Sequence, residues 1–260
     1  MRFLKRSISY ILILVSIQSI FGFDIGDIPV QDEGRVKPLD TYARNHLLAF
    51  YGKRSIKELD LTATDWLMNL VLDPHSGRQQ RIFNIRNPDV TASLSLEWSS
   101  EHKYSFNEIA PALNEQSAIL VSIDEKPNEE RTVFEKQLLE LSRNAMRFEE
   151  ISYLKALKLI PPGQQNDSDE WLSPYEFILT GMPMDEHQEK ILSSLQSYLS
   201  GRLAGQEQAM GSALIDYENA LLSNECFILF LLLLNLVNVL VSDSILSFFS
   251  ISSIFLIAFK

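Results

Sequence analysis

The chain has 260 residues, one cysteine and a formal net charge of −11 at pH 7. The lone Cys226 excludes an intrachain disulfide, and the sequence has neither a redox thiol pair nor a CxxCH haem-attachment motif. The acidic excess argues against a nucleic acid as partner, because binding to phosphates requires clustered Lys and Arg.

Residues 1–23 have the layout of a secretory signal peptide or a signal anchor. Arg2, Lys5 and Arg6 precede an apolar run from Ile8 to Phe23. The run ends without the small residues typical of a cleavage site, so cleavage and retention as a membrane helix both stay open. In either case we expect the following region to be exported, with the three cations in the cytoplasm.

Residues 226–260 are apolar as well. Two apolar stretches, 227–241 and 245–259, are separated by Ser242-Asp243-Ser244. One span followed by part of a second, a helical hairpin and a single tilted helix are the alternatives. We favour two short transmembrane segments with Asp243 at a turn, because a charge at mid-membrane costs about 2.5 to 3.5 kcal/mol. These segments would begin a multi-span domain that the chain does not contain in full.

Between these ends, residues 24–225 are expected to form an acidic extracytoplasmic domain. Four of the 23 Lys and Arg and one of the 34 Asp and Glu lie in the ends, which leaves 19 cations, 33 anions and a net charge of −14. We expect this charge to keep the domain soluble, with attraction of a basic partner as the alternative.

Apolar residues at intervals of three and four predict helices over much of this region, and short alternating runs predict strands. The clearest helix carries an apolar stripe at Phe134, Leu138, Leu141, Ala145 and Phe148. The sequence therefore predicts a mainly α domain with a small β element. In chain order we first expect an extended segment at 24–38 with a turn at Asp32-Glu33-Gly34, then helices from Pro38 to Gly52 and from Thr62 or Thr64 to Asp73. Two strands at 81–86 and 93–98, joined by a turn at 87–89, should follow. The remaining expected elements are a short helix from Ser105 to Pro111, a long helix from Glu129 to about Leu159, and helices at 173–179, 186–203 and 207–222.

No catalytic constellation is visible. His46, His75, His102 and His187 lack the HExxH or HxxxH spacing of a metal site, although a single axial haem histidine needs no sequence neighbour. The sequence contains no GxSxG elbow, no GxxxxGK[ST] phosphate loop and no GxGxxG turn. An exported hydrolase is therefore the weakest hypothesis.

The most unusual stretch is residues 28–44, which gathers charged residues around Gly34 and Pro38. This composition suggests a rigid turn tied by ion pairs and by contacts at a helix end. The residues of this candidate interaction site are Gln31, Asp32, Gly34, Arg35, Lys37, Pro38, Asp40 and Arg44.

Residues 29–44, PVQDEGRVKPLDTYAR, resemble the PVQDxGRxKPLDTxAR signature of the large cytochrome c assembly proteins of the CcsA/ResC/CcsB type, the haem-handling membrane component of System II cytochrome c biogenesis. The resemblance continues to about residue 110. The family's WGxxWxWD segment has no counterpart here, and we expect the separate Trp66, Trp98 and Trp171 to anchor the core. The later matches are Thr62-Ala63-Thr64-Asp65-Trp66-Leu67, Asp73-Pro74, Val90 and its neighbours, and Tyr104-Ser105-Phe106.

The resemblance implies a soluble docking or scaffold domain on the periplasmic side of the inner (cytoplasmic) membrane, ahead of a multi-span haem-handling domain. It implies haem in the complete machine, with none evident in this chain, and ResB-like membrane proteins and apocytochrome c as partners. Arg35, Lys37 and Arg44 would be the candidate cations for a haem propionate or an acidic partner. The alternatives are that these charges only fix the turn, and that the protein is a membrane-tethered envelope adaptor without a haem function.

Overall fold

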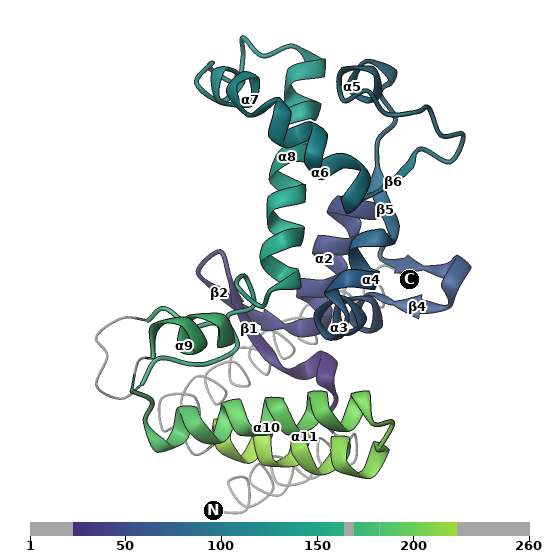
Figure 1. Ribbon diagram of the computed structural model, residues 1–260. Coiled ribbons are helices and arrows are strands. Elements are labelled where there is room, and N and C mark those ends of the chain that lie inside the picture. The colour runs from purple at the N-terminus through teal and green to yellow at the C-terminus, as the bar shows by residue number, and fades with distance from the viewer. Residues whose placement is uncertain (1–22, 164–168, 182, 223–260) are drawn as a thin grey trace, which may run out of the picture.

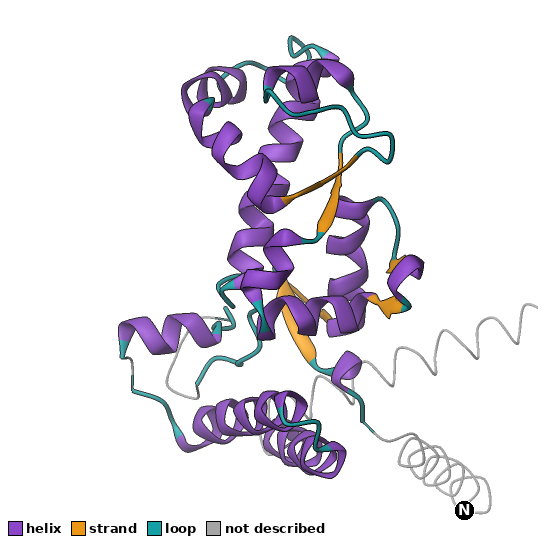
Figure 2. Ribbon diagram, turned by 45° about the vertical axis from the view of Figure 1, so that its right-hand side comes forward, coloured by secondary structure: helices purple, strands orange, loops and turns teal. Residues whose placement is uncertain are grey.

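The computed structural model describes residues 23–163, 169–181 and 183–222. It is mainly helical, with 62% helix and small antiparallel sheets, as the sequence predicts (Figures 1 and 2). Within these ranges, no helix has both the length and the apolar character needed to cross a membrane. The predicted signal or anchor segment and the predicted C-terminal transmembrane segments fall outside the described residues, except for Phe23.

The described elements are short 3-10 helices, strands and α-helices. The short 3-10 helices and strands are η1 (Ile25–Asp27), β1 (Pro29–Asp32), β2 (Arg35–Pro38), β3 (Ser55–Ile56), η2 (Lys57–Leu59), β4 (Leu61–Thr62), β5 (Arg81–Asn84) and β6 (Lys103–Ser105). The helices are α2 (Leu39–Tyr51), α3 (Ala63–Leu72), α4 (Pro74–Gln79), α5 (Pro88–Ser93), α6 (Phe106–Glu115), α7 (Ser117–Asp124), α8 (Val133–Ser152), α9 (Pro174–Thr180), α10 (Glu186–Leu203) and α11 (Glu207–Leu222).

Helix α8 forms the long axis of the molecule (Figure 1). Helices α6 and α7 pack beside one end of α8, and α2 and α3 lie toward its other end. Helices α10 and α11 pack side by side beyond that second end, with the β1–β2 hairpin between them and α8 (Figures 1 and 2).

Helix α8 is shorter at both ends than predicted, because local capping signals define its limits. The side chains and backbones of Thr132 and Glu135 form a capping box at its start. At its end, Leu154 takes a left-handed conformation with φ 60°, and Lys155 N–H donates to the carbonyl of Glu150. The predicted apolar stripe is confirmed as a packing face, with Phe148 fully buried.

The core beside α8 is aromatic. The ring of Phe148 packs against those of Phe50, Phe83 and Phe106 at centroid distances of 5.9, 5.4 and 5.3 Å. Trp66 packs edge-on against Phe50 at 6.0 Å. This cluster joins α2, α3, β5, α6 and α8 into one core.

The predicted strand at 93–98 is wrong. Asn87 accepts a hydrogen bond from Asp89 N–H and precedes Pro88, so the expected turn instead begins helix α5, which ends at Ser93. Strand β5 pairs with β6, farther along the chain. Asn87-Pro88 is thus a helix start that resembles a turn in sequence.

Three smaller predictions also need correction. Pro38 is the residue before α2 rather than its first residue. Helix α6 continues through Pro111 to Glu115. Trp98 is 48% exposed and does not anchor the core, whereas Trp66 and Trp171 are buried as expected.

The two ends of the described region meet at α11. The ring of Phe23, the first described residue, stacks on that of Tyr217 at 6.3 Å. The Tyr217 hydroxyl donates to the carbonyl of Leu159, and Arg202 of α10 forms an ion pair with Asp65 of α3 at 3.2 Å. These contacts attach the α10–α11 pair to the rest of the domain.

Candidate functional site

The predicted site residues lie on a tight β-hairpin and the first turns of the helix after it. Strands β1 and β2 pair in register from Pro29 with Pro38 to Asp32 with Arg35. Glu33 and Gly34 form the turn with φ values of 53° and 73°. Two successive positive φ angles are typical of a type I′ turn, in which glycine is favoured. The predicted turn is confirmed, and the pairing of its two arms was not predicted.

Gln31 connects the hairpin to the chain after α8. Its backbone N–H donates to the carbonyl of Lys158 at 3.0 Å. Its side-chain amide donates to the carbonyl of Asp169 at 2.9 Å and accepts from the N–H of Trp171 at 2.8 Å. One glutamine therefore fixes two backbone groups of a segment about 140 residues away in sequence.

Asp32 and Lys37 form an ion pair across the hairpin, with Nζ and Oδ2 2.8 Å apart. Both side chains are largely buried, at 12% and 20% exposed. Asp40 of α2 accepts from Arg44 on the same helix at 3.0 Å and from the hydroxyl of Thr64 on α3 at 3.1 Å. These charges fix the hairpin and join α2 to α3.

Arg35 differs from the other predicted cations. Lys37 and Arg44 each contact a carboxylate of the same site. Arg35 lies at the start of β2, is exposed, and has no hydrogen bond or ion pair of its side chain among the described residues. Of the three candidate cations, Arg35 is therefore the one without a carboxylate partner among the described residues.

His46 belongs to the same cluster, although it was not among the predicted site residues. It lies on α2 between Tyr42 and Phe50, with ring centroids 4.2 and 5.9 Å away. Its Nε2 is 4.0 Å from Oδ2 of Asp32. Burial lowers the pKa of His46 to about 4, while Asp32 opposes this shift. The i, i+4, i+8 spacing of the three rings was the sequence signal that could have indicated this.

A groove of about 640 Å³ lies beside the hairpin. Its lining includes Gln31, Asp32, Glu33 and Gly34, together with residues of α8 and of the chain that follows α8. Anions outnumber cations there, with Lys158 already paired with Glu170. The groove is polar, and its side chains can form hydrogen bonds and ion pairs with a partner. Its lining does not combine a nucleophile with a neighbouring base.

Lys103 is a second group with a perturbed pKa. Burial lowers its pKa to about 8. Its ammonium donates to the carbonyl of Tyr51 and lies 3.6 Å from the centre of the Tyr51 ring. These contacts fix β6 to the end of α2, which is a structural role.

Comparison of the sequence with protein-family models and with curated proteins gave no match. The resemblance to the cytochrome c assembly family therefore stays a prediction from the sequence.

The four histidines lie on four different parts of the fold. His46 is enclosed by its neighbours on α2, and His75 contacts Gln79 on the surface. His102 packs against the exposed Trp98, and His187 lies in the first turn of α10. No histidine lines the hairpin groove. Over the described ranges, His, Cys, Asp and Glu form no group that could hold a metal ion.

Proposed function

We propose that this protein is a membrane component of cytochrome c maturation. Residues 24–225 would act as an outward-facing docking or scaffold domain for the machine that delivers haem and attaches it to apocytochrome c. The observation that carries the proposal is the signature at residues 29–44, which combines a resemblance to the family with a defined structural role. In this proposal, haem is held by other parts of the complete machine.

The contacts of the signature residues support a scaffold role. Gln31 connects the hairpin to the segment that leads toward α9, and Asp40 connects α2 to α3. A change in the hairpin would therefore shift several elements together. Arg35 remains at the surface of this rigid unit, where it could contact an acidic group of a partner.

The positions of the two described ends also agree with the proposal. The Phe23–Tyr217 contact places the start of the described region beside α11, its last helix. Apolar segments that continue from both ends could then enter one membrane on the same side of the domain. The positive-inside rule applied to Arg2, Lys5 and Arg6 would place the domain on the outer face.

A replacement strain tests this function. The chromosomal copy is exchanged for one carrying Arg35→Glu, and covalently bound haem in the c-type cytochromes is measured by haem staining of denaturing gels. We expect the haem signal to fall while the level of the variant protein in the membrane stays normal. Arg86→Glu is the matched control, because Arg86 is also exposed and lies outside the signature.

An unchanged haem signal in the Arg35→Glu strain would remove Arg35 from the interaction surface. An unchanged signal after removal of residues 24–222, with both apolar ends kept, would reject the haem-attachment function. The protein would then be an envelope adaptor without a haem function.

A further inference from the structure

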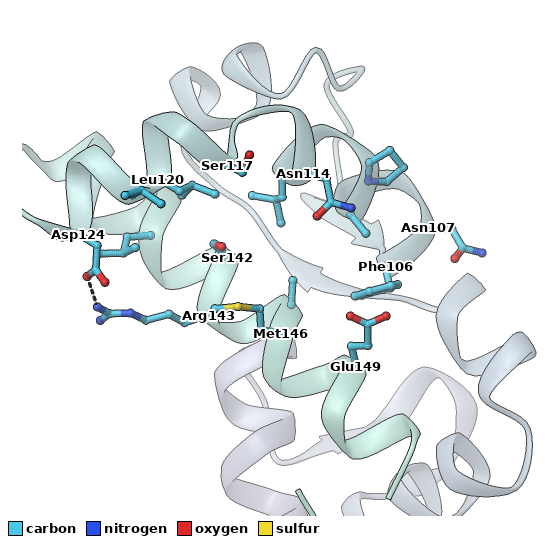
Figure 3. A pocket seen from close by; sticks show the side chains of 16 residues that line it. Phe106, Asn107, Asn114, Ser117, Leu120, Asp124, Ser142, Arg143, Met146 and Glu149 are labelled. Carbon is cyan, nitrogen blue, oxygen red and sulfur yellow. Dashed lines mark hydrogen bonds and ion pairs between the residues drawn. The ribbon is translucent and has the colours of Figure 1, made fainter. Parts of the chain in front are cut away.

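A second groove lies between α6 and α7 on one side and α8 on the other (Figure 3). Its volume is about 700 Å³. Phe106, Leu113, Leu120 and Leu139 contribute to its apolar lining. Its edges carry exposed apolar side chains, with Val121 59% and Met146 56% exposed. Exposed apolar residues that line a concave surface are typical of a protein-binding site.

Polar groups surround this apolar floor. Figure 3 shows Ser117 and Asn114 on the α6–α7 side and Ser142 on α8. At one end, Asp124 pairs with Arg143 across the groove at 2.6 Å. This ion pair closes one end, so that an occupant would lie along the groove between the helices.

The segment that forms the groove has an acidic excess. Residues 106–152, which span α6 to α8, contain ten Asp and Glu and five Lys and Arg. Both acidic residues of the lining are already paired, Asp124 with Arg143 and Glu149 with Arg78, which lies over the ring of Phe106. Glu115, Glu125 and Glu140 are exposed, follow directly after residues that line the groove, and form no ion pair among the described residues.

We infer that the groove binds an amphipathic helix of a partner protein whose apolar face enters between α7 and α8 and whose polar face is basic. The apolar floor and the unpaired, exposed glutamates next in sequence to lining residues together fit this occupant, since helices bind such grooves through anchors at i, i+3, i+4 and i+7. Met146 suits such a surface because its unbranched thioether side chain adapts to different partners.

The groove lies at the end of the molecule opposite to α10 and α11 (Figure 1). The inference rests on the proposed function in one respect: a docking domain held at the membrane beside α11 would present this groove away from the bilayer. It thereby assigns the docking role to a defined surface and a defined partner chemistry.

The test uses the full chain in nanodiscs of zwitterionic phosphatidylcholine, because detergent would compete for an apolar groove and anionic lipid would bind a basic peptide. The probe is a fluorescent helical peptide with Leu at i, i+3, i+4 and i+7 and Lys on the opposite face. Binding is followed by fluorescence anisotropy and corrected for binding to empty nanodiscs. We expect saturable binding that weakens as salt increases.

Two variants locate the peptide. Met146→Lys and Val121→Lys each replace an exposed apolar edge residue with a cation and should weaken binding by about tenfold or more. Leu203→Lys is the matched control, because Leu203 is 70% exposed at the opposite end of the molecule and should leave the affinity unchanged. Circular dichroism checks that each variant is folded.

Equal affinity of the wild-type chain and both groove variants would overturn the inference. So would equal binding of a peptide with the same composition in scrambled order, or of one with Glu in place of Lys. Groove-dependent dimerisation of the chain, detected by light scattering, would assign the surface to a second copy and also reject it. Failure of the haem-attachment function is distinguishable, because it changes cytochrome haem content and not peptide affinity.

Discussion

The side chain of Gln31 provides the sharpest test of the hairpin's structural role. Replacing it with Ala removes the acceptor for the partly buried Trp171 N–H and the donor to the carbonyl of Asp169. An unsatisfied buried N–H costs about 1 to 3 kcal/mol. We therefore expect Gln31→Ala to lower the free energy of local opening at Trp171 by about 2 kcal/mol, which corresponds to about thirtyfold faster amide exchange.

Hydrogen exchange on the full chain measures this effect at the Trp171 amide. Gln31→Glu is the matched control, because a carboxylate keeps the acceptor for Trp171 N–H while losing the donor to Asp169. Its Trp171 amide should stay close to wild-type protection, and the amide of Tyr198 in α10 should not change in either variant. Equal protection of the Trp171 amide in wild type and Gln31→Ala would refute the structural role of the Gln31 side chain.

Three further predictions concern the turn, the buried histidine and the core. Gly34→Ala should destabilise the fold by about 1 to 2 kcal/mol. An added Cβ meets no atom within 4 Å, so the main cost is backbone strain at φ 73°. Glu33→Gly relieves the same kind of strain at φ 53° and should raise the urea midpoint of unfolding, whereas Gly34→Ala should lower it. The folded-state pKa of His46, about 4, is below its ordinary value of 6.5, so the unfolded state binds more protons between these pH values. Up to about 3 kcal/mol of stability, present above pH 6.5, should therefore be lost as the pH falls to 4. In urea unfolding, the free energy of unfolding of His46→Phe should change less with pH over this range than that of the wild type, and an equal change in both would mean that the histidine titrates normally in the folded state. Phe148→Ala should cost about 3 to 5 kcal/mol in the same assay, because the ring is fully buried against three other phenylalanines, and a loss below about 1 kcal/mol would contradict its central place in the core.

Much of the helical structure was predictable because its signals are local. The predicted ranges 186–203 and 207–222 match the bounds of α10 and α11. Asp185 caps α10 through its side chain, and a capping box of Ser105 with Glu108 begins α6. Apolar spacing and capping residues act within one or two turns, so that they can be read without tertiary information.

Elements that depend on distant partners were harder to predict. The partner of β5 is β6 rather than the neighbouring run at 93–98, and the alternation in that run is too short to distinguish a strand from other structure. Helices α4, α5 and α7 were not expected. Each has only six to eight residues, so that packing rather than sequence period decides its formation.

The candidate site was predictable in part for the same reason. The turn at Glu33-Gly34 and the Asp40–Arg44 pair involve neighbours in sequence or neighbours on a helix. The contact of Gln31 with Trp171 crosses most of the domain, and no local pattern indicates it. The apolar groove likewise forms only when α6 and α7 pack against α8.

The most direct test of the proposed function is the amount of covalently bound haem in the c-type cytochromes of cells that lack this chain. Haem staining of membrane and periplasmic fractions, calibrated by the level of each apocytochrome, gives the measurement. We expect the haem signal to be lost while apocytochromes are still made, and to return when the chain is restored. Normal haem attachment in the absence of the chain would contradict a role in cytochrome c maturation.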